Sequence, residues 1–305
     1  MHTTAQAADR LYFAKTAHII VNAPGLFRSP EKGDRDRYIR IKHNLDKLEF
    51  EIAGPVLSSA ELRVLRAAAA LAGPAFSGQP APEGQSKLDR LESLLTRSLP
   101  LRTSYTELAR LAGYSTGSSA RAAVRNALKR LAGVTMSVTE GARGLVLGHL
   151  ISLASGREND CLTIGLCPAV MMAVLGGRGD YVRVSLDEAN ALKTDPARLL
   201  HHRLHWLQPG LPHSVNLDTM LPYVYPECAD SASTLRTRRA TLRRALKELG
   251  DAGIGWTVSH VGDKYTIGRP ASRSDRGRPP GRIADALPAG SRTPPGRIAD
   301  ANSCR

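Results

Sequence analysis

The chain has 305 residues, of which 42% are hydrophobic, and it carries a formal net charge of +14 with a pI near 10.0. This apolar content excludes a wholly disordered chain and suffices for one large or two modest domains. The charge favours a polyanionic partner, either nucleic acid or an anionic membrane.

The N-terminal region and the cysteines narrow these alternatives. The longest apolar stretch there, around residues 18–21, is too short for a signal peptide or a membrane span, which disfavours a membrane partner. The four cysteines show no CxxC spacing, so we expect reduced thiols in a cytoplasmic protein.

The first elements follow a turn-rich N-terminal arm, residues 1–36. The alternation in YIRIKHNLDKLEFEIAGP predicts a hairpin over 38–55, and a helix over 58–73 begins with Ser58 as N-cap. A Pro/Gly-rich loop over 74–86 then precedes a helix over 86–98.

The next unit has the order of a winged helix. Ser104 and Glu107 have capping-box spacing and predict a helix that ends at Gly113. The turn YSTGSS leads to a helix over 119–132, and strands are expected over 134–138 and 144–153. Helix, turn, helix and hairpin therefore follow one another.

This order is repeated later in the chain. Ser185 and Glu188 again have capping-box spacing, and a helix from Asp195-Pro196 is expected to run to Gly210. A short helix over 217–224 and a helix over 233–249, ended by Gly250, precede strands over 256–260 and 264–268.

The predicted architecture is therefore α+β, with two tandem winged-helix domains over 37–176 and 177–270. Residues 271–305 form a tail rich in Arg, Pro, Gly and Ala that contains PPGRIADA twice and is expected to be disordered. Its seven Arg and three Asp contribute +4, so +10 of the +14 belongs to the predicted domains.

Two basic helices point to the partner. The segments RAAVRNALKRL (121–131) and RATLRRALKEL (239–249) agree at seven of eleven positions. Each has an apolar face and a one-sign stripe at i, i+4 and i+8, formed by Arg121, Arg125 and Lys129 and by Arg239, Arg243 and Lys247. Like charges at i, i+4 destabilise a helix, so double-stranded DNA is the expected partner of both stripes.

The candidate contacts divide by side-chain chemistry. On the second helix the candidates for base reading are Arg236, Thr237, Ala240 and Arg244, and the stripe residues are expected to contact phosphates. On the first helix Ser118, Ser119 and Asn126 occupy the equivalent front. In the second wing we expect Lys264 to contact phosphate and Trp256 to pack inside.

Motifs typical of enzymes and metal sites are either missing or lie in the wrong structural context. Gly113–Gly117 matches GxSxG, but a helix precedes it where a nucleophile elbow needs a strand. His201 and His205 share a helix face without an HExxH motif, and neither a P-loop nor the His-apolar-His pair of a nicking enzyme occurs. We therefore expect no catalytic residue, no metal and no cofactor.

Several ordered segments resemble the RepC replication initiators of IncQ-type plasmids. They are APGLFR (23–28), ARLLHHRLHW (197–206), DTMLPYVYP (218–226), STLRTRR (233–239), GWTV (255–258) and KYTIGRP (264–270). The resemblance implies a non-enzymatic protein that binds iterons at a plasmid origin, helps to open the adjacent AT-rich DNA and admits a plasmid-encoded helicase and primase. It also implies self-association. The tail departs from the family pattern, and a transcriptional repressor bound to an operator remains the alternative.

Overall fold

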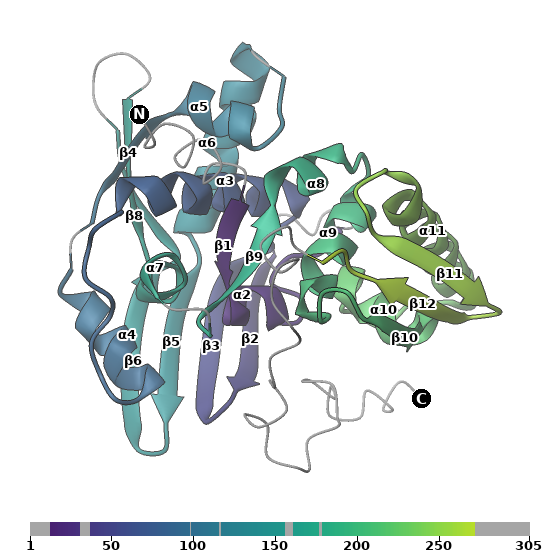
Figure 1. Ribbon diagram of the computed structural model, residues 1–305, viewed down its shortest axis with the longest axis horizontal. Coiled ribbons are helices and arrows are strands. Elements are labelled where there is room, and N and C mark those ends of the chain that lie inside the picture. The colour runs from purple at the N-terminus through teal and green to yellow at the C-terminus, as the bar shows by residue number, and fades with distance from the viewer. Residues whose placement is uncertain are drawn as a thin grey trace.

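The computed structural model describes residues 13–30, 37–97, 99–115, 117–155, 161–176 and 179–271. Over these residues the fold is α+β, with a larger N-terminal part and a smaller C-terminal part that meet at helix α9 (Asp195–Arg203) (Figure 1). The predicted tail from residue 272 and much of the predicted arm lie outside the described residues.

A four-stranded antiparallel sheet of order β2-β3-β5-β6 forms one wall of the larger part. Its strands are β2 (Tyr38–Leu45), β3 (Leu48–Pro55), β5 (Thr135–Glu140) and β6 (Arg143–His149). The predicted 38–55 hairpin is confirmed, since Leu45 pairs with Leu48 across a turn in which Asp46 has a φ of 58°. Phe50 and Ile52 alternate inward from β3, as the period of a half-buried strand requires.

Helix α3 (Ser59–Ala75) lies at the centre of the larger part and packs on β1 (Phe13–Ala17) and α6 (Ser118–Ala132). Its predicted start is confirmed by a capping box: the Ser58 amide donates to the Glu61 carboxylate at 2.7 Å, and the Ala60 amide donates to the Ser58 hydroxyl at 3.2 Å. The four alanines at 67–70 are buried, and their small side chains let several neighbours approach the helix closely.

The first predicted helix-turn-helix order is present. A turn joins α5 (Tyr105–Leu111) to α6, and Gly113 there has a φ of 68°. A Cβ at Gly113 would lie 2.6 Å from the side chain of Asn190 on α8 (Leu186–Ala191), and the Asn190 amide donates to the carbonyl of Leu111 at 3.0 Å. The turn is therefore held against a helix from the predicted second domain.

The predicted single strand over 144–153 is wrong. Strand β6 ends at His149, and β7 (Ile151–Ser155) belongs to a second sheet of order β4-β8-β7. Leu150 lies between them: its amide donates to the Val134 carbonyl at 2.7 Å and its carbonyl accepts from Cys167 at 3.1 Å. Apolar residues continue across this corner at Leu147, Leu150 and Ile151, so the apolar run by itself does not mark it.

The second sheet is completed by β4 (Leu101–Ser104) and β8 (Cys161–Leu166). The larger part also contains helices α4 (Lys87–Leu95) and α7 (Pro168–Leu175). Helix α4 is shorter than the predicted 86–98 and packs against α7.

Part of the predicted arm is built into the fold. Strand β1 pairs antiparallel with β9 (Tyr181–Ser185), and α2 (His18–Asn22) follows β1 directly. A strand from the predicted arm thus pairs with a strand from the predicted second domain. The division at residues 36, 176 and 270 stays a prediction.

The C-terminal part contains α10 (Leu217–Val224), α11 (Ala232–Asp251) and a sheet of order β10-β12-β11. Its strands are β10 (Pro212–Asn216), β11 (Thr257–Val261) and β12 (Lys264–Gly268). The predicted helices and hairpin are present, but β10 adds a third strand. Helix α11 does not end at Gly250; it continues to Asp251, and the left-handed glycine is Gly253, with a φ of 68°.

Two other expectations are corrected. Helix α9 ends at Arg203 and passes into the 3-10 turn η2 (Leu204–Trp206), so it does not run to Gly210. Cys161 and Cys167 are free thiols, whereas Cys228 is disulfide-bonded. Among the described residues, no helix is long and apolar enough to cross a membrane.

Candidate nucleic-acid interface

Helix α11 carries the predicted basic stripe on its outer side. Leu242, Leu246 and Leu249 are fully buried beneath it and fix which side faces outward. Arg239 is half-buried, and the exposed side chains are those of Arg236, Thr237, Ala240, Arg243, Arg244 and Lys247. All predicted contacts of this helix are therefore accessible to a partner.

Helix α6 has the same arrangement with a different front. Val124, Leu128 and Leu131 are buried, while the predicted contacts Ser118, Ser119, Arg121, Arg125, Asn126 and Lys129 are exposed. The Arg125 guanidinium lies 5.1 Å from the centre of the Tyr105 ring on α5, a cation–π contact that orients this side chain.

Two arginines of the α11 stripe are bound by carboxylates of the same chain. Arg239 donates through Nε and Nη2 to Asp218 at 2.8 and 2.6 Å, and Nη2 of Arg243 donates to Asp263 at 2.8 Å. The hydrogen bond from Arg243 lowers the pKa of the Asp263 carboxyl. The α11 stripe thus has counter-charges within the chain, which come from residues 20 and 21 positions away.

The β5–β6 and β11–β12 hairpins differ in the side chains at their turns. Lys264, the predicted phosphate contact, is exposed beside Val261, whose side chain is 87% exposed. Beside the first turn, Arg143 donates to Asp89 at 2.9 Å and to Glu92 at 3.0 Å, both on α4. Sequence patterns did not single out Arg143, since its partners lie more than fifty positions earlier in the chain.

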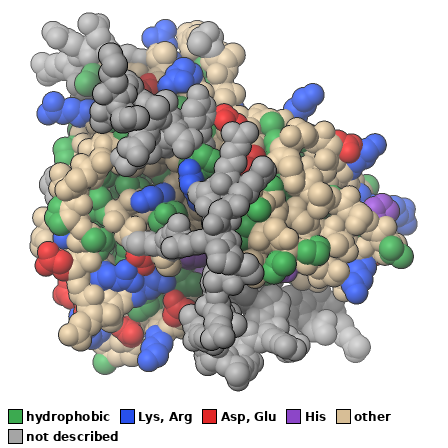
Figure 2. Space-filling view, in the orientation of Figure 1, with side chains coloured by type: hydrophobic (Ala, Val, Ile, Leu, Met, Phe, Trp, Pro, Cys, Tyr) green, Lys and Arg blue, Asp and Glu red, His purple; other side chains and the backbone are tan. Residues whose placement is uncertain are grey.

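The ion pairs are also visible as neighbouring basic and acidic side chains on the surface. In the view of Figure 2, basic and acidic side chains lie close together over the lower area of the larger part. At the outer end of the C-terminal part, where the β11–β12 hairpin lies, basic, His and hydrophobic side chains meet.

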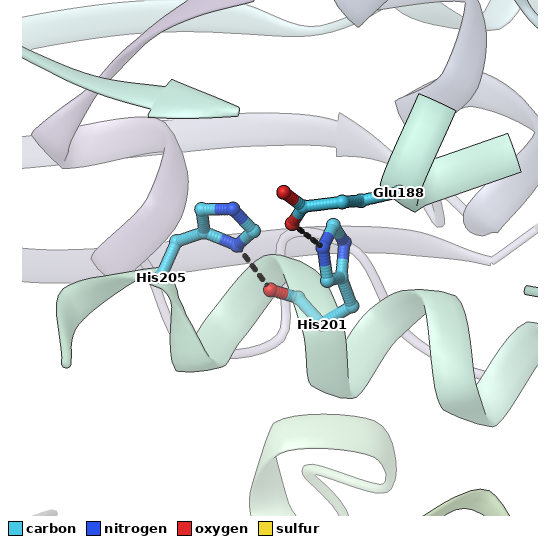
Figure 3. Close-up of side chains that lie close together, drawn as sticks. All are labelled: Glu188, His201 and His205. Atoms are coloured by element: carbon cyan, nitrogen blue, oxygen red, sulfur yellow. Dashed lines mark hydrogen bonds and ion pairs between the residues drawn. The ribbon is translucent and has the colours of Figure 1, made fainter. Parts of the chain in front are cut away.

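A buried polar cluster connects α8, α9 and the start of the second hairpin, and Figure 3 shows its Glu188, His201 and His205 side chains. One carboxylate oxygen of Glu188 accepts from Trp256 Nε1 at 3.1 Å and lies 3.3 Å from His201 Nε2. His205 Nδ1 donates to the carbonyl of His201. Trp256 is 3% exposed, so it packs inside, as expected from the sequence.

The ligand atoms of Glu188, His201 and His205 lie within 4.8 Å of one another, which is close enough for a metal ion. The hydrogen bonds of the cluster already engage Glu188, His201 Nε2 and His205 Nδ1. Burial lowers the pKa of His201 to about 4 and that of His205 well below 6.5, so both rings are neutral near pH 7. These hydrogen bonds join three elements of the fold.

Comparisons with known proteins identify one protein family and two similar solved structures. The family model of Replication protein C (RepC) matches residues 9–271. A crystal structure of domains 2 and 3 of RctB has a TM-score of 0.50 at 10% identity and covers 80% of this chain and 94% of its own. A second RctB structure of the same domains has a TM-score of 0.49 at 12% identity, covering 83% and 96%. No curated protein sequence matches.

The buried histidines predict a pH dependence of stability. Because burial lowers their pKa, the unfolded chain binds protons below pH 6.5 while the folded chain does not bind one at His201 until about pH 4. The free energy of unfolding, measured by urea denaturation, should therefore fall as the pH drops from 6.5 towards 4.

His205→Gln should make this dependence shallower, since it removes one histidine that the fold keeps neutral. His149→Gln, at an exposed site on β6, serves as the control and should retain the slope of the parent protein. An equal slope in all three proteins would contradict the assignment.

Proposed function

The chain belongs to the replication protein C (RepC) family, and on that premise we propose that it initiates DNA replication by binding iterons, directly repeated sites at an origin. One observation carries the proposal: α6 and α11 each expose a basic face, and each lies after a helix and turn and before a hairpin. Membership in the family supports the replication role, and the two exposed faces support contact with DNA.

We assign α6 and α11 as the recognition helices of two winged-helix domains. In this arrangement each helix enters a major groove, and the hairpin that follows lies beside the phosphate backbone. Two such helices on one chain suit a repeat about two helical turns long.

The two helices divide the work of recognition. Arg236, Thr237, Ala240 and Arg244 read bases from α11, because Arg binds guanine through two hydrogen bonds and Thr reaches other base edges. Ser118, Ser119 and Asn126 take this role on α6. Arg121, Arg125, Lys129, Arg239, Arg243, Lys247 and Lys264 bind phosphates.

Initiation then follows from the number of bound copies. Bending a site smoothly costs about 1–6 kcal/mol, and several copies on adjacent repeats supply more contact energy than one. Deformation of the neighbouring AT-rich DNA opens the origin for a plasmid-encoded helicase and primase, and contacts between bound copies assist it. The protein breaks no covalent bond in this scheme and acts without a cofactor.

The alternative, a repressor that binds an operator, uses the same helices. Permanganate footprinting on DNA flanking the gene separates the two functions, because permanganate modifies unpaired thymines. We expect a protected series of direct repeats and reactive thymines beside it when the protein binds. Protection without new reactivity would favour the repressor, and no protected repeat would refute both.

Arg236→Ala should weaken binding to the cognate repeat by about 1–3 kcal/mol and relax specificity at one base pair, because it removes a base contact. The measurement is a titration of the protein against all single-base variants of the repeat. Arg102→Ala, at an exposed site on β4, is the matched control. An equal loss on cognate and random DNA would contradict the assigned role.

Lys129→Ala and Lys247→Ala should each lower the slope of log affinity against log salt concentration by about 0.9, because each removes one phosphate contact. Site preference should not change. Lys42→Ala, whose side chain is paired with Glu49 on the sheet, is the control with the same charge change. A slope equal to that of the parent protein in the Lys129 or Lys247 variant would remove that residue from the interface.

A further inference from the structure

The carboxylates of Asp218 and Asp263 lie directly against the proposed DNA-contacting side of α11. Arg239 and Arg243, one turn apart, are bound to Asp218 and Asp263 respectively, so two ion pairs run side by side along the helix. The Asp218 and Asp263 side chains are 60% and 65% exposed. Both carboxylates are therefore exposed on the surface that the proposed DNA would cover.

The two carboxylates come from one hydrogen-bonded corner. Asp218 lies in the first turn of α10, and Asp263 lies in the turn between β11 and β12. The Leu217 amide donates to the Asp263 carbonyl at 2.9 Å, and Asn216 pairs with Lys264 in the sheet. This corner sets the position of both acids relative to the arginines.

The pairing is selective among the basic residues proposed to meet DNA. Over the described part of the chain, no ion pair involves Arg236 or Lys247 on α11, or Arg121 and Lys129 on α6. Arg125 contacts a tyrosine ring in place of a carboxylate. Two positions of α11 are therefore restrained by acids while their neighbours are not.

Exposed ion pairs contribute little to stability, because solvent and salt screen them. A phosphate can therefore displace Asp218 or Asp263, but the displaced carboxylate stays in its corner and repels the phosphate. Non-specific binding depends on phosphate charge alone, so it suffers fully from this repulsion. Cognate binding is positioned by base contacts as well, so it depends less on freeing Arg239 and Arg243 from their acids, and the repulsion falls mainly on non-specific binding.

We propose that Asp218 and Asp263 are specificity-determining residues that reduce binding to non-cognate DNA by holding Arg239 and Arg243 in competition with phosphates. The inference rests on the proposed DNA-binding function. The two acids lie outside α11, so the sequence pattern of that helix does not include them.

The test uses the full chain with Asp218→Asn, Asp263→Asn and the double substitution. Each is titrated over a range of salt concentrations against two duplexes of equal length, one carrying the footprinted repeat and one of random sequence. Affinity for the random duplex should rise on the order of three- to ten-fold per substitution, and its salt slope should steepen by about 0.9 for each freed arginine. Affinity for the repeat should rise less, so the ratio of the two affinities falls.

Asp251→Asn is the matched control. It makes the same charge change at the C-terminal end of α11, at an exposed carboxylate that forms no ion pair with any described residue. It should leave the salt slope and the affinity ratio unchanged. Thermal unfolding of each variant confirms that the fold is kept.

Three results would overturn the inference: Asp218 and Asp263 variants that behave like the Asp251 variant, equal gains on both duplexes, or weaker binding to the repeat. The last would mean that the acids position the arginines for cognate contact. Failure of the proposed function looks different, because the parent protein would then protect no repeat. The random duplex would still report whether the acids restrain the arginines.

Discussion

The hydrogen bond between the buried guanidinium of Arg66 and the ring of His202 is the contact on which the arrangement of the two parts depends. Arg66 Nη2 donates to His202 Nδ1 at 2.9 Å, and His202 Nε2 donates in turn to the carbonyl of Ile20 at 3.1 Å. Burial lowers the pKa of Arg66 to about 9, which still leaves it charged at pH 7. A buried charge is costly unless it is hydrogen-bonded, so this network admits few alternative geometries.

Other polar side chains at the C-terminal end of α9 also form hydrogen bonds to neighbouring elements. Arg203 donates to the carbonyl of Val21 at 2.7 Å, and the Glu188 carboxylate links His201 to Trp256. Helix α9 therefore fixes α2, α3, α8 and the start of the second hairpin at once. Because α3 packs on α6, and α9 packs on α11, the relative placement of the two basic helices follows from this junction.

The ion pairs of α11 change how a one-sign stripe is interpreted. The like-charge argument considers neighbours at i, i+4 on one helix, and at that range the stripe has no partner. Asp218 and Asp263 reach it from another helix and from a hairpin turn. Exposed basic residues on α11 thus fall into two groups, those restrained by acids and those open to solvent. The stripe of α6 lacks such acids among the described residues, so the two helices are not equivalent despite their matching sequences.

The sequence by itself determined the local elements, because their signals are short-range. Capping at Ser58, the period of the 38–55 hairpin, the buried leucines of α11 and the exposure of the candidate contacts are all visible within one or two turns of chain. Only the tertiary structure decided the corner at Leu150, the pairing of β1 with β9 and the carboxylates that bind Arg239 and Arg243. Each of these joins segments far apart in the chain, and such contacts depend on packing and register that no local periodicity encodes.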